Sequence, residues 1–147
     1  EGRNHPLLKN FDVSDKWVNV HLVEITKAPE GSIILASSNQ CSNHVMQVSE
    51  NAYSCQFHPE VCGHTFEGWM CIPGIPSSLE NLIGKEGLVN FQDELEMNLP
   101  ANNKASHTLF NNWCDLVFNW LHSKRINVKI RFLIGLIYYD CKKLLPM

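Results

Sequence analysis

Three short apolar segments follow one another so closely that they leave little choice of topology. Ser32 to Ser37 is an apolar run, Val45 to Val48 is a second, and Tyr53 to Phe57 alternates apolar and polar side chains. These patterns predict β-strands, the last of them half-buried. A parallel return would need a connection of a dozen or more residues. We therefore predict that these strands pair largely antiparallel.

Further elements are predicted on both sides of these strands. The segment from Trp17 to Val23 alternates apolar and polar residues, which predicts another strand. Cys62 to Pro76 contains three Gly and two Pro and predicts a loop. Three helices should follow: a short one opened by Ser77 and stopped by Gly84 or Gly87, a second over about 90–98 ended by Pro100, and a longer one capped by Ser106 and running to about Leu121.

The charge of the chain is divided unevenly along its 147 residues, a length typical of one domain. Residues 1–121 hold six basic and fourteen acidic side chains, a formal charge of −8, whereas residues 122–147 hold six basic and one acidic, a formal charge of +5. The basic residues of this tail are mixed with Ile, Leu and Tyr and lack an amphipathic period. We therefore expect no nucleic-acid partner.

The cysteines and the apolar runs bear on the compartment. The run from Phe132 to Tyr139 is too short to span a bilayer, so no membrane partner is expected. The chain opens without a charged region followed by an apolar one, and its six Cys are irregularly spaced. This usage favours reduced thiols over a disulfide framework, and we expect a cytoplasmic protein.

The last predicted strand ends in His58-Pro59-Glu60. Pro59 fixes its own φ and pushes His58 towards extended geometry, in which residues i and i+2 face the same side. Glu60 can therefore orient the imidazole of His58 and stabilise its protonated form. This is the third-group role in a nucleophile–base–orienter arrangement. No nucleophile for such an arrangement is obvious.

A metal site is an alternative interpretation of the same region. Residue types that suit zinc gather there, namely Cys55, His58, Cys62, His64 and Cys71. Their spacings match no common structural-zinc pattern, and strand alternation already accounts for Cys55. We therefore expect no metal and no other cofactor.

The stretch from Gln56 to Glu60, with its alternating strand before it and a Gly-containing loop after it, resembles the class I glutamine amidotransferases. In that family the last triad residues lie in a strand that ends Gln-Phe-His-Pro-Glu. Upstream, His21, Ile25, Pro29 to Gly31, and Leu35 to Ser37 also fit the family pattern. The similarity covers about residues 4–121. It is closest to the branch that includes the GMP synthase amidotransferase domain and the plant-type γ-glutamyl peptidases.

The resemblance implies an α/β fold: residues 1–121 would be the C-terminal portion of a flavodoxin-like class I glutamine amidotransferase domain, incomplete, followed by a basic apolar tail over 122–147. In the family, a Cys thiolate attacks the side-chain amide of glutamine or a γ-glutamyl compound and releases ammonia. By position, His58 matches the general base and Glu60 its orienter. His21 matches a recurrent histidine near the active site, where it would contact the substrate.

The chain departs from the family in its nucleophile. The family Cys lies in an elbow of the type Gly-x-Cys-x-Gly, N-terminal to the His-Pro-Glu, and no Cys here has Gly at both of those positions. We expect little or no glutaminase activity from this chain alone, and whether it is an enzyme stays open at this point. The alternative is a non-catalytic binding or regulatory module that docks on a synthase partner. A truncated sheet would also expose an edge, which predicts self-association.

Overall fold

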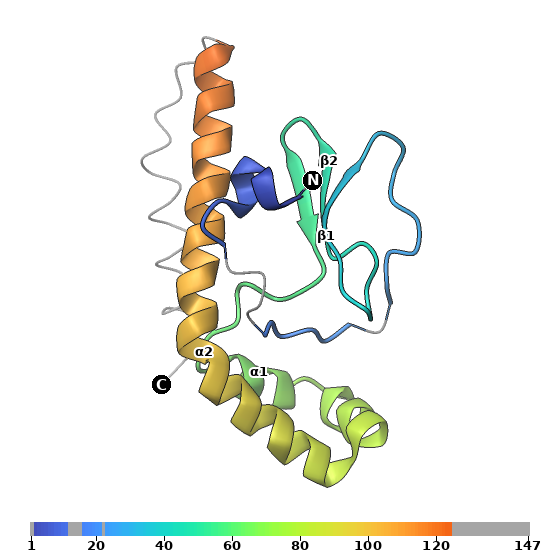
Figure 1. Ribbon diagram of the computed structural model, residues 1–147. Helices are drawn as coiled ribbons and strands as arrows, with labels where there is room; N and C mark the ends of the chain where they lie inside the picture. The colour runs from blue at the N-terminus through green and yellow to red at the C-terminus, as the bar shows by residue number, and fades with distance from the viewer. Residues whose placement is uncertain (1, 12–15, 22, 125–147) are drawn as a thin grey trace. The chain divides into compact units, whose positions relative to one another are not determined.

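A computed structural model describes residues 2–11, 16–21 and 23–124. Its elements are two 3₁₀ turns, three strands and two helices: η1 (Gly2–Asn4), η2 (Pro6–Leu8), β1 (Ile33–Ala36), β2 (Val45–Ser49), β3 (Ala52–Cys55), α1 (Thr65–Met70) and α2 (Ile75–Ser123) (Figure 1). The chain divides into two compact units, Glu1–Leu116 and Val117–Met147. In the second unit the described residues are 117–124, so the predictions for the tail fall almost entirely outside the described residues.

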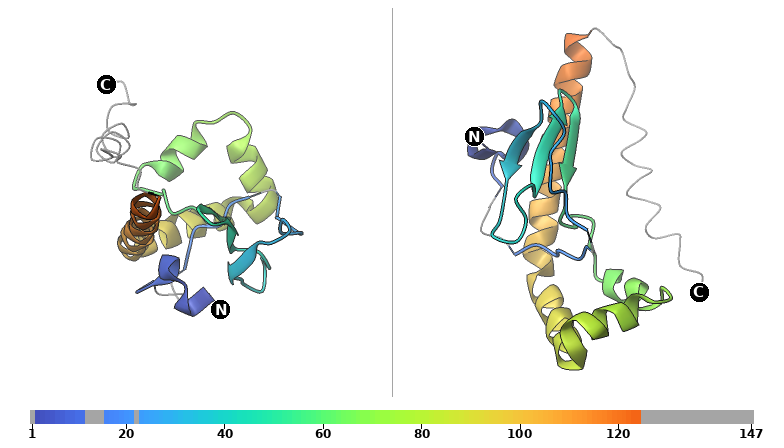
Figure 2. Two further views of the ribbon diagram at one scale, coloured as in Figure 1. Left: turned by 90° about the horizontal axis from the view of Figure 1, so that it is seen from above. Right: turned by 90° about the vertical axis from the view of Figure 1, so that its right-hand side faces the viewer.

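The three strands form one antiparallel sheet in the order β1-β2-β3. Met46 of β2 lies opposite Ile34 of β1 and Ser54 of β3. Figure 2 shows the three strands side by side. The predicted antiparallel pairing is confirmed, and a small sheet with helices agrees with the α/β class. β3 ends at Cys55, two residues earlier than predicted.

The predicted strand over Trp17 to Val23 is wrong for the residues described there, 17–21 and 23. A backbone hydrogen bond from His58 N to Val18 O at 2.9 Å joins this segment to the residues that follow β3. The alternation serves packing instead, because Val18 is buried and Val20 packs on the same apolar cluster.

The predicted loop over Cys62 to Pro76 contains the helix α1. Thr65, at the first position of α1, accepts a hydrogen bond on its hydroxyl from Cys62 N at 2.8 Å. This local bond turns the chain into the helix despite the glycines on either side.

The three predicted helices are one element, α2, with a kink. Gly84 has φ +74° and ψ 172°, a left-handed conformation that breaks the helical path and that glycine adopts without strain. The predicted stop at Gly84 is therefore present as this kink, visible in the yellow-green part of α2 (Figure 1). The predicted end at Pro100 and the predicted cap at Ser106 are wrong, because the helix continues through both.

Burial explains why α2 survives Pro100. A proline inside a helix removes one hydrogen bond and costs about 3 kcal/mol. On either side of it, however, Leu95 and Ala105 are buried in the core. Most helical stability in proteins comes from such packing rather than from local propensity. Within the described part of the chain, none of the helices combines the length and apolar character that a membrane span requires.

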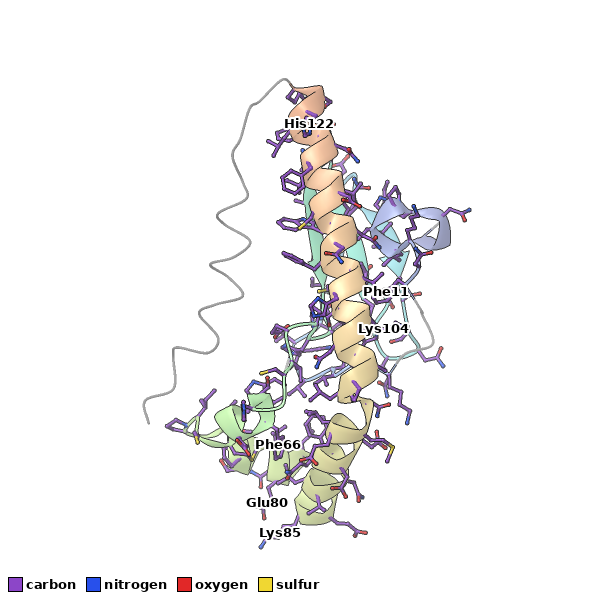
Figure 3. All side chains as sticks on the ribbon, turned by 90° about the vertical axis from the view of Figure 1, so that its left-hand side faces the viewer. Phe11, Phe66, Glu80, Lys85, Lys104 and His122 are labelled. Atoms are coloured by element: carbon purple, nitrogen blue, oxygen red, sulfur yellow. The ribbon has the colours of Figure 1, made fainter. Side chains whose placement is uncertain are left out.

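Two apolar clusters lie in the core of the part of the chain that the structure describes. The sheet-side core consists of Leu7, Leu8, Leu35, Val45 and Phe57, with side chains such as Trp17, Leu109 and Leu116 packed against it. The helix-side core consists of Val18, Val61 and Leu95, with Phe66, Trp69, Phe91 and Leu99 around it. Phe66 extends from α1 towards α2, where its ring meets that of Phe91 at 5.9 Å (Figure 3). The tripeptide His58-Pro59-Glu60 thus lies between Phe57 of one core and Val61 of the other.

Candidate active site

His58 and Glu60 are in direct contact. His58 Nδ1 lies 2.6 Å from Glu60 Oε1, a distance typical of a charge-assisted hydrogen bond. A carboxylate can only accept, so Nδ1 is the ring nitrogen that carries a proton in this contact. The His58 side chain is 30% exposed and that of Glu60 is 67% exposed. The structure therefore brings together the two residues that the sequence singled out.

The second ring nitrogen of His58 faces the backbone of the segment that contains Val18 and Val20. Nε2 lies 3.1 Å from Val20 O, and the rings of His58 and Trp69 make a T-shaped contact with their centroids 5.6 Å apart. A carbonyl oxygen is also an acceptor. The hydrogen bonds to Glu60 and to Val20 O can exist together only when both ring nitrogens carry a proton. A neutral His58 can therefore make only one of these two hydrogen bonds.

Two further residues support this pair, and the sequence patterns did not assign them to it. The hydroxyl of Ser106 donates a hydrogen bond to Pro59 O at 2.6 Å. The sequence predicts Ser106 as a helix cap, and the Trp69 ring is the one that contacts the imidazole of His58. No local pattern could have found the Ser106 contact, because Ser106 is 47 residues away from Pro59 in the chain.

His21 is exposed and lies near His44. Burial of His44 lowers its pKa, and the neighbouring charge of His21 lowers this pKa further. Among the interactions recorded for the described residues, none joins His21 to the His58–Glu60 pair. Its predicted contact with the substrate stays a prediction, although it directly follows Val20, whose carbonyl meets the His58 ring.

Comparison with known proteins now identifies the segment that contains this pair. The family model "Glutamine amidotransferase class-I" matches residues 2–70. Residues 2–70 belong to the class I glutamine amidotransferase family. The GMP synthase [glutamine-hydrolyzing] of Clostridium botulinum is 30% identical over 89 residues, which are 60% of this chain and 17% of that protein. The chain therefore spans less than a fifth of the length of this relative. No solved structure matches the chain.

This amidotransferase segment, residues 2–70, includes the sheet, the His58–Glu60 pair and α1. The match begins near the predicted start of the similarity and ends at Met70. The wider similarity, up to residue 121, stays a prediction, as does the assignment to a branch of the family.

The cysteines of the amidotransferase segment differ in their surroundings. Cys41 is fully buried and its thiol donates to Gln56 Oε1 at 3.5 Å, while the exposed Cys62 accepts from the hydroxyl of Thr65. Burial raises the pKa of Cys55 to about 11, and the charge of Glu60 adds to the effect. An amidotransferase nucleophile needs the opposite, a thiol whose pKa is lowered. Cys55 is therefore a packing residue.

The described residues include no group of three or more His, Cys, Asp or Glu side chains arranged to hold a metal ion. The five residues considered for zinc are divided instead: His58 pairs with Glu60, and His64 pairs with Glu67 at 3.5 Å. Cys71 directly follows the last residue of α1, and it is exposed.

Cys55 gives the folded protein a pH dependence in alkaline solution. Its pKa rises from an ordinary 9.0 to about 11 on folding, so its stabilisation is present in full below pH 9 and is lost as the pH rises through about 11. A difference of two pKa units corresponds to about 2–3 kcal/mol. We expect urea unfolding of the wild type to lose that much more free energy between pH 9 and 11 than unfolding of Cys55→Ala. Cys62→Ala, at an exposed thiol, should follow the wild type. If the free energy of unfolding changes with pH in the same way for the wild type and for Cys55→Ala, the raised pKa of Cys55 is contradicted.

Proposed function

We propose that this chain supplies the base and its orienting carboxylate to a glutaminase site of the class I amidotransferase type. The observation that carries the proposal is the 2.6 Å contact between His58 Nδ1 and Glu60 Oε1 inside the segment that matches the family. Residues 1–121 would form the C-terminal portion of a flavodoxin-like domain. The substrate would be glutamine or a γ-glutamyl compound, in keeping with the name of the glutamine-hydrolysing relative.

The chemistry assigned to the pair follows from its two ring nitrogens. Nε2 of His58 takes the proton of a cysteine thiol, and the thiolate attacks the amide carbonyl carbon of the substrate. The imidazolium, held at Nδ1 by Glu60, then gives its proton to the departing ammonia, which leaves a γ-glutamyl thioester. Water, deprotonated by Nε2, hydrolyses this thioester to glutamate and restores the thiol.

The thiol in this proposal comes from an elbow of the Gly-x-Cys-x-Gly type on a segment other than residues 1–147. Such an elbow places the sulfur at a helix N-terminus, which lowers its pKa and supplies donors for the oxyanion. Cys55 has the opposite surroundings, since burial raises the pKa of its thiol. The chain alone should therefore hydrolyse no glutamine.

The test is complementation with such a segment. Ammonia release from glutamine is measured for the full chain, for a separately made elbow segment of a class I amidotransferase, and for the two mixed or fused. We expect hydrolysis only from the combination, and none when the elbow Cys is replaced by Ser. A glutamine-protected adduct between an electrophilic glutamine analogue and one of this chain's own cysteines, detected by intact mass, would overturn the proposal. A combination that forms a complex but stays inactive would also overturn it.

A further inference from the structure

The hydroxyl of Ser106 makes an unusual choice of partner. Inside a helix, Ser and Thr hydroxyls commonly bond back to the carbonyl four residues earlier. Thr108 does so, donating to Lys104 O at 3.1 Å, in the section of α2 that Lys104 marks in Figure 3. Ser106, only two residues away, instead donates to Pro59 O at 2.6 Å, outside its own helix. The bond ties α2 to the middle of the His58-Pro59-Glu60 tripeptide.

This bond fixes the peptide that carries Glu60. The carbonyl of Pro59 and the N–H of Glu60 belong to one planar unit. The pyrrolidine ring already fixes φ of Pro59, so anchoring its carbonyl restricts the remaining rotation about ψ. This plane contains the N and Cα atoms of Glu60, so the bond fixes the point from which the Glu60 side chain starts. Because the Glu60 side chain is 67% exposed, packing does little to hold its carboxylate, and the backbone must do so.

The section of α2 that presents Ser106 is itself held firmly. The residue before it, Ala105, is 7% exposed, and Asn102, one turn earlier on the same face, is 5% exposed. On the other side of the tripeptide, His58 N donates to Val18 O. The tripeptide is therefore anchored at His58 by the Val18 segment and at Pro59 by α2.

We propose that Ser106 is a positioning residue for the His58–Glu60 pair, because its hydroxyl fixes the Pro59–Glu60 peptide so that the carboxylate stays at His58 Nδ1. The catalytic meaning of this role rests on the proposed function. Ser106 lies outside the amidotransferase segment, so the site would extend beyond residues 2–70 to a helix that the family match does not cover.

The direct test is nuclear magnetic resonance of the full ¹⁵N-labelled chain. The readout is the Nδ1–H signal of the His58 ring, assigned by its loss in His58→Ala. Ser106→Thr and Ser106→Val add the same bulk and differ only in the hydroxyl. We expect the signal in the wild type and in Ser106→Thr, and its loss through solvent exchange in Ser106→Val. Thr108→Val, which removes a hydroxyl from the same helix, should keep it. If Ser106→Val does not fold, the same signal is measured in Ser106→Ala, which removes only the oxygen and should also lose it.

Three results would overturn the inference. The signal could persist in a folded variant without the hydroxyl, it could vanish in Ser106→Thr together with Ser106→Val, or it could be absent from the wild type. A second measurement separates this inference from the proposed function. In the combination with an elbow segment, Ser106→Val should lower kcat about tenfold and leave KM unchanged. An inactive wild-type combination would reject the proposed function while the spectra still decide on Ser106. If the wild-type combination is active and Ser106→Val has the same kcat, the contribution of Ser106 to catalysis is rejected while the proposed function stands.

Discussion

In the combination with an elbow segment, His58→Ala lowers the kcat for glutamine hydrolysis by about two to four orders of magnitude, the usual contribution of a general acid–base group. Alanine can neither take the thiol proton nor return it to ammonia. Glu60, which lies 2.6 Å from Nδ1 in the wild type, has no ring left to orient. The measurement is ammonia release under saturating glutamine, with KM determined in parallel.

The matched control is His64→Ala. His64 also pairs with a carboxylate, Glu67, at 3.5 Å, and its side chain is exposed. Its removal should leave kcat within a factor of about two, since exposed ion pairs contribute little. Equal losses in His64→Ala and His58→Ala would show that the loss is not specific to His58. Hydrolysis that survives in His58→Ala would remove the base from the proposal.

Phe57→Ala is expected to lower the free energy of unfolding by about 3–5 kcal/mol, the cost of deleting a buried aromatic ring. Phe57 is 6% exposed, and its ring centroid lies 4.5 Å from that of Trp17 and 5.8 Å from that of His44. The loss is a large fraction of the 5–15 kcal/mol typical of a domain. Urea unfolding followed by tryptophan fluorescence and by circular dichroism measures it.

Leu82→Ala serves as the control for this substitution, because Leu82 is 73% exposed on α2. It should change the free energy of unfolding by no more than about 0.5 kcal/mol. In Phe57→Ala the urea concentration at the midpoint of unfolding should fall, while the m-value stays constant. A loss below about 1 kcal/mol would mean that Phe57 does not anchor the sheet-side core.

The parts of this structure that follow from short-range rules could be predicted from the sequence. The apolar pattern of the strands and the short connections between them were sufficient to predict the antiparallel sheet. The contact between His58 and Glu60 is of the same kind, since it depends on two residues on either side of one proline. The kink at Gly84 likewise reflects a conformation that glycine adopts without strain.

The parts that depend on distant residues could not be predicted. Local rules predicted that one helix ends at Pro100 and that another begins at Ser106. In the structure α2 continues through both, because residues on both sides of Pro100 are buried. The bonds from Ser106 to Pro59 and from the His58 ring to Val20 join residues 47 and 38 positions apart. Periodicity and capping patterns carry no information about such pairs. The alternation of apolar and polar residues around Val18 predicted a strand, but in the structure it reflects the packing of the apolar side chains.

The placement of His58 between the two cores has a consequence for hydrogen exchange. The amide proton of His58 is bonded to Val18 O at 2.9 Å, and the tripeptide that follows is flanked by Phe57 and Val61, one from each core. That proton exchanges with solvent when the chain near Val18 separates from His58. Its exchange rate therefore reports the opening free energy of the junction itself. A single backbone amide thus measures how stably the tripeptide is held at the Val18 segment.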